Sequence, residues 1–160
     1  MNQTTTKKPK QLAVRPNERD FKYIIVHSSG TMQGAPFTAQ DLHQMHLQRK
    51  WAGIGYNIVV ELDGHVVLGR SLVYQGAHCK AHGRNNDSIG VCYIGGTDCE
   101  HNAADTRTRE QKIALDAVLQ TLKAVWPAAE ITGHRKWEPT ECPSLNAARE
   151  FAHITGDTIL

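Results

Sequence analysis

Two short apolar runs constrain the fold of this chain more than any other feature of its sequence. Residues 21–29 read FKYIIVHSS and residues 88–96 read SIGVCYIGG, and both combine β-branched and aromatic residues in a strand-like length. The first run is apolar on both alternating faces, which is typical of a strand in a sheet that is covered on both sides. Its alternation places four residues on one side of the strand, the last at the strand end: Phe21, Tyr23, Ile25 and His27.

A first helix that could cover such a sheet is predicted over residues 38–51, which read TAQDLHQMHLQRKW. Thr38 and Asp41 form an N-cap pair at its start. Leu42 and Met45 recur at helical spacing, and the glycines that follow end the helix.

A second helix is predicted over residues 108–126. It begins with a capping box of Thr108 and Gln111 and ends before Pro127. The sequence predicts a broad apolar face, whose members include Ile113, Val118, Leu122 and Val125.

A β-hairpin is predicted where YNIVVEL (56–62) and HVVLGR (65–70) flank Asp63-Gly64. Tyr56 would open its first strand. A short strand, AEITGH (129–134), is predicted next, and a last helix is predicted to start at Ser144. Three residues of that helix are expected to face inward: Leu145, Ala148 and Phe151.

These elements follow the order β-α-β-β-β-α-β-α, which predicts an α/β fold: a single domain with a central mixed β-sheet flanked by helices on both faces. The chain has 160 residues, the size of one domain with its own core. We expect a flexible polar N-terminal arm over residues 1–20, the domain over 21–155 and a C-terminal tail over 156–160.

Charge and hydropathy limit the classes of function. The net charge is +2 and the basic residues are scattered, which argues against nucleic-acid binding. No apolar run reaches the roughly 18 residues of a membrane span, so membrane insertion is not expected. The arm is basic but has no apolar segment after it, so it does not resemble a secretory signal. The sequence therefore predicts a protein made in the cytoplasm.

The cysteines indicate neither disulfides nor a zinc ribbon. Of the four, Cys79, Cys92, Cys99 and Cys142, no two have C-x-x-C spacing, and disulfides are rare in a reducing cytoplasm. Cys92 is interpreted as a small apolar residue of a buried strand. Cys79 and Cys99 are interpreted as incidental.

Cys142 has to be judged with the segment GHRKWEPTECPS, residues 133–144. His134 and Cys142 lie eight residues apart there, separated mainly by loop residues. Two interpretations remain open from the residues alone: a surface loop with a stray thiol, or two ligands of a metal. With His27 they would supply the three protein ligands of a catalytic zinc, because neighbouring strands could bring the two histidines together.

Four blocks in order add weight to the second interpretation. IIVHSSGT, GIGYNIVVELDGHVVLGR, GAHCKAHGRNNDSIGVCYIGG and ITGHRKWEPTECPS together resemble the zinc-dependent N-acetylmuramoyl-L-alanine amidase family, which includes phage lysozyme-type endolysins and peptidoglycan recognition proteins. The resemblance runs from about Phe21 to Phe151. It implies one zinc ion per chain, with His27, His134 and Cys142 as its ligands.

The resemblance also implies catalytic roles. Tyr56, in GIGY, matches the family's catalytic tyrosine, and Thr140 stands where phage members have a lysine and catalytic recognition proteins a threonine. A zinc ion with a thiolate ligand keeps a net positive charge that polarises an amide carbonyl and acidifies water. Tyr56 and Thr140 could then donate hydrogen bonds to the oxyanion. The general acid stays open, with Glu141 a weaker candidate for a base. Asn57 replaces a histidine that is frequent after the tyrosine.

Substrate contacts are expected from the loop that follows the hairpin. His78 matches a histidine that related members hold near the groove for the glycan or stem peptide, with plain loop solvation as the alternative. Asn85 and Asn86 are further candidate hydrogen-bonding partners of the substrate.

The function implied is hydrolysis of the amide between N-acetylmuramic acid and L-alanine of bacterial peptidoglycan, by a phage or prophage endolysin that reaches the wall after the membrane is permeabilised. Two alternatives stay open: a cytoplasmic amidase that recycles muropeptides, and a non-catalytic peptidoglycan-binding module. The second alternative typically lacks the ligand cysteine, whereas Cys142 is present. Some phage members also bind an RNA polymerase, a contact that applies here only by analogy.

Overall fold

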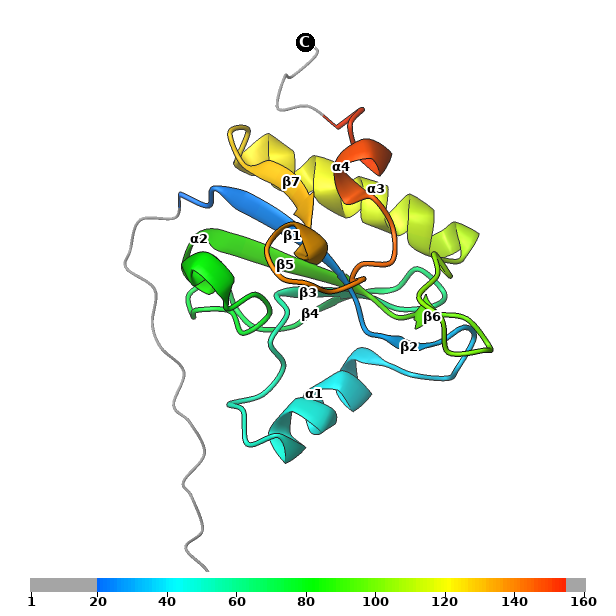
Figure 1. The fold of residues 1–160 in the computed structure, drawn as a ribbon. Coiled ribbons are helices and arrows are strands. Elements are labelled where there is room, and N and C mark those ends of the chain that lie inside the picture. Colours follow the sequence, from blue (N-terminus) through cyan, green and yellow to red (C-terminus); the bar gives the residue numbers. More distant parts are fainter. Residues whose placement is uncertain (1–19, 155–160) are drawn as a thin grey trace, which may run out of the picture.

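The computed structural model describes residues 20–154. Of the arm predicted over residues 1–20, all but the last residue lies outside this range, as do residue 155 and the whole tail predicted over 156–160. Within the described part the chain forms one five-stranded sheet with helices on both sides (Figure 1). The predicted fold class, α/β with a central mixed sheet, is confirmed.

The sheet has the strand order β4-β3-β5-β1-β7. The strands are β1 (Tyr23–Ser28), β3 (Ile58–Val60), β4 (Val66–Leu68), β5 (Ser88–Tyr93) and β7 (Glu130–Gly133). β1 is parallel to both β5 and β7, β3 is parallel to β5, and only β4 runs antiparallel to its neighbour β3. Since β1, β5 and β7 are parallel, their carboxyl ends lie at the same edge of the sheet.

The two apolar runs that open the sequence form the centre of this sheet. β5 is buried at every position, and β1 is buried at every position after Tyr23. The alternation predicted for the first run is wrong at its start: Phe21 lies in the same core cluster as Ile24 and Val26. The reason is that β1 begins only at Tyr23, so Phe21 precedes the pleated segment.

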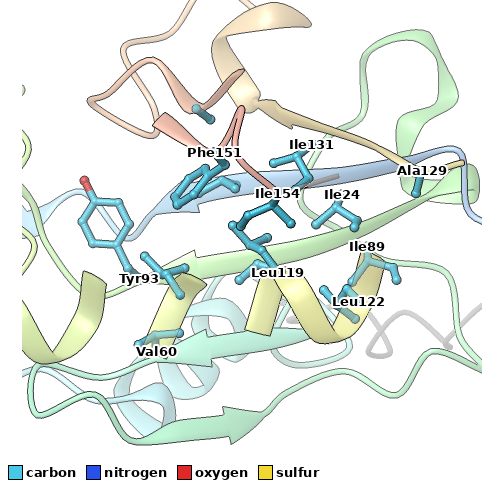
Figure 2. Packing of buried hydrophobic residues seen from close by; sticks show 14 of the residues in the cluster. Ile24, Val60, Ile89, Tyr93, Leu119, Leu122, Ala129, Ile131, Phe151 and Ile154 are labelled. Carbon is cyan, nitrogen blue, oxygen red and sulfur yellow. The ribbon is translucent and has the colours of Figure 1, made fainter. Parts of the chain in front are cut away.

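Helices cover the sheet from both faces. α1 (Ala39–Gln48) lies on one side, and α3 (Arg109–Val125) and α4 (Ala147–Glu150) lie on the other (Figure 1). The larger core cluster packs α3 and α4 against the sheet, and Figure 2 shows Leu119, Leu122 and Phe151 in contact with its strand residues. A smaller cluster joins Ala39 and Leu42 of α1 to the opposite face.

Both capping boxes predicted from the sequence are present, at Thr38–Asp41 and at Thr108–Gln111. The apolar face predicted for α3 is only partly right, because Ile113 and Val125 are 62% and 60% exposed. Leu122 is buried as predicted, and the other buried side chains of this helix are Gln111, Leu115 and Leu119.

The start predicted for the last helix is wrong. α4 begins at Ala147, where the Asn146 side chain accepts the N–H of Arg149 at 3.1 Å, whereas Ser144 has φ +63° and cannot start a right-handed helix. Ala147 is therefore buried in place of Ala148, which is exposed. Phe151 is buried as expected.

Several short elements were not predicted. β2 (Thr31–Met32) and β6 (Gly96–Thr97) form a small parallel sheet beyond the ends of β1 and β5. α2 (Arg84–Asp87) leads directly into β5 and follows the 3-10 turn Ala81–Gly83, whereas the 3-10 turn His134–Lys136 directly follows β7. Among residues 20–154, no helix has the length and apolarity needed to cross a membrane.

Candidate metal centre and cleft

The carboxyl ends of β1 and β7 bring two histidines together. His27 is the second-last residue of β1, and His134 directly follows β7. Because these strands are neighbours and parallel, the two imidazoles meet at the same edge, with ring centroids 4.6 Å apart. The position of each histidine thus follows from the strand order.

The loop after His134 folds back and brings Cys142 to the same place. The Arg135 N–H donates to the Cys142 carbonyl at 2.8 Å, which closes the loop. The Cys142 sulfur accepts the N–H of Ser28 at 3.3 Å and lies 3.6 Å from Nδ1 of His27. One donor atom each from His27, His134 and Cys142 lies within 4.8 Å of the other two.

This geometry and this donor set fit a zinc ion. Two ligands of a tetrahedral zinc, with Zn–N near 2.0–2.1 Å and Zn–S near 2.3 Å, stand about 3.6 Å apart. That is the distance between His27 Nδ1 and Cys142 Sγ. Burial, with the nearby His78 and His134, lowers the pKa of His27 well below its ordinary value, so its imidazole is neutral and can act as a ligand.

His78 lies behind His27, where it can fix the orientation of that ring. His78 Nδ1 is 2.9 Å from His27 Nε2, which leaves Nδ1 of His27 to face Cys142. The His78 ring packs on Gly90 of β5, where a Cβ would come within 2.6 Å of it, so only glycine fits. His78, which was expected to contact the substrate, does line the larger of two hollows at this centre. However, it is only 8% exposed and its ring contacts His27, a candidate metal ligand.

Tyr56 lies beside the histidines, with its ring centroid 5.1 Å from that of His27. It does not open a strand as predicted, because β3 begins two residues later at Ile58. Burial raises the pKa of Tyr56 well above its ordinary value, and the thiols of Cys92 and Cys142 raise it further. Its phenol therefore stays protonated in neutral solution and can donate a hydrogen bond.

The residues on either side of Tyr56 hold it in place. The Gly55 N–H donates to Nδ1 of His46 at 3.0 Å. The buried Asn57 side chain accepts the N–H of Gly90 and donates to the carbonyl of Arg70, both at 2.9 Å. Asn57, which replaces the histidine frequent in the family, therefore ties this loop to β5.

Thr140 and Glu141 have different environments. Thr140 Oγ1 accepts the N–H of Cys142 at 3.2 Å, a contact that uses an oxygen lone pair and leaves the hydroxyl able to donate. The Glu141 side chain is 71% exposed and lies 3.8 Å from Arg135, so it points toward solvent.

Two hollows meet at this centre. A cleft of about 650 Å³ runs along one side and a hollow of about 330 Å³ along the other; Tyr56 and His134 line both. Asn85 lines the larger cleft, but its Oδ1 accepts the N–H groups of His78 and Cys79 at 2.8 Å each. Asn86 is exposed and is not among the residues that line either hollow.

Glu138 was not predicted from the sequence as a residue of this centre, yet its Oε2 lies 3.2 Å from Nε2 of His134. Its other oxygen, Oε1, accepts the N–H groups of Lys80 and Ala81 at 3.2 and 3.1 Å. The one signal in the sequence was the spacing of four residues from His134, which places a carboxylate near the imidazole wherever the chain turns helically.

Comparisons with known proteins agree with one another. A family model described as N-acetylmuramoyl-L-alanine amidase matches residues 17–144. An endolysin of Enterobacteria phage K11 is 35% identical over 131 residues, which are 82% of this chain and 85% of the relative. An endolysin of Escherichia phage T7 is 33% identical over 126 residues, 79% of this chain and 82% of the relative.

Among solved structures, the endolysin N-acetylmuramoyl-L-alanine amidase LysCS from Clostridium intestinale URNW superposes with a TM-score of 0.68 at 25% identity. The match covers 88% of this chain and 84% of that one. Similarity in sequence and in fold therefore extends over nearly all of the described residues.

Proposed function

This chain belongs to the N-acetylmuramoyl-L-alanine amidase family, whose reaction is hydrolysis of the amide between N-acetylmuramic acid and L-alanine. We propose that the chain catalyses this reaction with one zinc ion held by His27, His134 and Cys142. The similarity to phage endolysins over most of both chains makes it a phage endolysin that cleaves peptidoglycan. The non-catalytic module considered from the sequence is set aside accordingly.

The observation that carries the zinc proposal is the convergence of three donor atoms from distant parts of the chain. When bound, zinc would supply a Lewis acid that polarises the scissile carbonyl and increases the acidity of water. Cys142 would hold it as a thiolate. Burial raises the pKa of the Cys142 thiol, and the N–H of Ser28 opposes that shift by stabilising the charged form.

Tyr56 would stabilise the oxyanion that forms at the carbonyl. Its phenol remains protonated, since burial raises its pKa, and its ring is close to His27. A preorganised donor of this kind is worth about 10²–10³ in rate. Thr140, two residues before Cys142, is the second candidate donor, because its proton is not used by the contact with the Cys142 N–H.

The substrate would cross the centre from one hollow to the other. Arg49 and Lys80 line the larger cleft, which suits a stem peptide that carries carboxylates, whereas Ser29 and Thr97 line the smaller hollow, which suits a sugar. His78 would act mainly through His27, and Asn85 mainly by shaping the loop, so their substrate contacts are secondary.

We further propose that the protein is made in the cytoplasm of a host bacterium and meets the wall after the membrane is permeabilised. Soluble muropeptides would then be poorer substrates than the polymer, in contrast to the alternative of a recycling amidase. A contact with RNA polymerase through residues 1–20 rests on analogy alone, and these residues lie almost entirely outside the described part of the chain.

The experiment that tests the function is digestion of purified cell walls with and without a zinc chelator. We expect new amino ends on L-alanine, no new reducing sugars, and loss of both turnover and solubilisation when the metal is removed. New reducing sugars would mean a glycosidase. Full activity after complete removal of the metal would contradict the zinc proposal.

A further inference from the structure

A second group of metal-binding side chains lies beside the first and shares one residue with it. One donor atom each from Cys79, His134 and Glu138 lies within 4.8 Å of the other two. A thiol, an imidazole and a carboxylate form a donor set that zinc accepts in proteins. Neither Cys79 nor Glu138 is a ligand in the function proposed above.

Each carboxylate oxygen of Glu138 contacts a different part of the chain. Oε1 accepts the N–H groups of Lys80 and Ala81 and thereby fixes the carboxylate against the loop that carries Cys79. Oε2 faces Nε2 of His134 at 3.2 Å. The carboxylate is thus oriented before any cation arrives, which reduces the entropy lost on binding.

His134 contributes a buried nitrogen, Nε2, that faces the Glu138 carboxylate without a well-directed hydrogen bond. Nε2 is buried, and within the described residues it has no partner with the geometry of a hydrogen bond; the approach of Glu138 Oε2 is close but poorly directed. A buried polar atom without a hydrogen bond is costly, so it calls for an explanation such as a missing ion.

Cys79 completes the group from the wall of the cleft. It is 1% exposed, and Asn85 Oδ1 fixes its backbone by accepting its N–H at 2.8 Å. Burial raises the pKa of its thiol to about 12, which keeps it protonated without a cation, while the Ala81 N–H favours the thiolate. A bound cation would displace the thiol proton to solvent. With the first ion on the other ring nitrogen of His134, the imidazole would also release its remaining N–H proton to solvent and bridge the two ions as an imidazolate.

We propose that Cys79, His134 and Glu138 bind a second, thiophilic divalent cation such as Zn²⁺ or Cd²⁺, and that this binding inhibits hydrolysis. Inhibition rests on the proposed function, because all three residues line the larger cleft and His134 would be shared with the first ion. The binding itself does not depend on that function.

The test counts cations and thiolates together. Metal-free protein that carries Cys99→Ser is used as the parent, because Cys99 is exposed and would bind Cd²⁺ on its own. Cd²⁺ is titrated while bound metal is measured by equilibrium dialysis and the thiolate-to-cadmium absorption is followed. We expect two ions and two thiolates for the parent, one of each for Cys79→Ser and for Cys142→Ser, and none when both are replaced.

The outcomes separate this proposal from the first. If the parent binds one ion that Cys79→Ser keeps and Cys142→Ser loses, the second site is overturned and the first stands. If Cys142→Ser keeps that ion and Cys79→Ser loses it, the first site fails and the second stands.

Glu138→Gln provides a check that leaves both thiols in place. The amide oxygen can still accept from Lys80 and Ala81, so the loop should keep its shape, but the charged ligand is gone. We expect the second ion to bind roughly tenfold or more weakly. Unchanged affinity would exclude Glu138 from the site.

Inhibition is measured as wall-lysis activity against added Zn²⁺, each variant relative to its own activity at one equivalent. We expect excess Zn²⁺ to inhibit the parent and to inhibit Cys79→Ser only at concentrations at least about tenfold higher. Equal sensitivity of the two proteins would overturn the inhibitory role.

Discussion

At the scale of single residues, the centre depends on groups that orient its neighbours as much as on the three candidate ligands. His27 has one nitrogen against His78 and the other toward Cys142, so the choice of ligand atom is made by a contact 51 residues away in the chain. Neighbours of this kind commonly change metal affinity by about 10–100-fold when they are removed.

His78→Ala should therefore weaken zinc binding by about 10–100-fold, measured by competition with a chromophoric chelator. A residue that only contacted substrate would instead raise KM and leave zinc affinity unchanged. His65→Ala is the matched control, because His65 is exposed in the turn of the hairpin. Equal zinc affinity of His78→Ala and the wild type would contradict the orienting role.

Tyr56→Phe removes only the hydroxyl group. If the phenol stabilises the oxyanion, kcat should fall by about 10²–10³ with little change in zinc content or thermal stability. Steady-state digestion of cell walls, together with metal analysis of the same samples, checks this. A variant with more than about half of the wild-type kcat would leave Tyr56 without a catalytic role.

At the scale of elements, the candidate metal centre lies at the carboxyl ends of parallel strands, and helices pack on both faces of the sheet that these strands form. α3 contributes several buried leucines to the larger core cluster, where they pack against residues of β3, β5 and β1 (Figure 2). Of the residues that the sequence pattern placed inward on this helix, Leu122 is buried as predicted, whereas Ile113 and Val125 are exposed.

Leu119→Ala and Ile113→Ala test which face of α3 is buried. Leu119 is 0% exposed, so its truncation should lower the free energy of unfolding by about 2–5 kcal/mol. Ile113 is 62% exposed, and its truncation should change that free energy by less than about 0.5 kcal/mol. Denaturant unfolding measures both, and similar losses for the two variants would contradict the observed face.

A buried arginine joins the start of α3 to α4. Arg107 pairs with Asp105 and with Glu150, each at 2.8 Å. Hydrogen bonding to Arg107 lowers the pKa of Asp105 below its ordinary 3.8. This contribution to stability is therefore complete above pH 3.8 and is lost as the pH falls through the lower pKa of the folded state.

Asp105→Asn should accordingly be less stable than wild type by a constant amount from neutral pH down to about pH 4. Below about pH 4 the free energies of unfolding of Asp105→Asn and wild type should approach each other. Asp63→Asn, in the turn of the hairpin where asparagine is equally suited, should track the wild type throughout. If the difference in free energy of unfolding between Asp105→Asn and wild type grew as the pH fell, the pKa of Asp105 would be raised by folding and not lowered.

At the scale of the whole molecule, the sequence predicted what depends on local pattern and missed what depends on close contact. The central strands, the hairpin and both capping boxes follow from periodicity and turn chemistry, and the family assignment is confirmed by the comparisons. The two-residue strands β2 and β6 are too short to leave a pattern. The last helix starts later than predicted because Asn146 caps it, whereas Ser144 has a positive φ and lies outside the helix.

The candidate metal centre shows the same division. His27, His134 and Cys142 were named from the sequence because they stand at strand ends and in a family motif. The contact of His78 with His27 could not be, since it depends on the loop after the hairpin folding back onto β1 and β5. Glu138 was missed although it stands only four residues after His134. Their roles as neighbours of candidate ligands remain predictions.

In the proposed centre, two imidazoles and one thiolate that are far apart in the sequence hold a single zinc ion. X-ray absorption at the zinc edge, measured on the Cys79→Ser variant loaded with one equivalent of zinc, identifies the atoms bound to the metal. We expect one sulfur near 2.3 Å and nitrogen or oxygen neighbours near 2.0–2.1 Å, with the sulfur lost when Cys142 is also replaced by serine. A zinc shell without sulfur in the first variant would contradict the proposed centre.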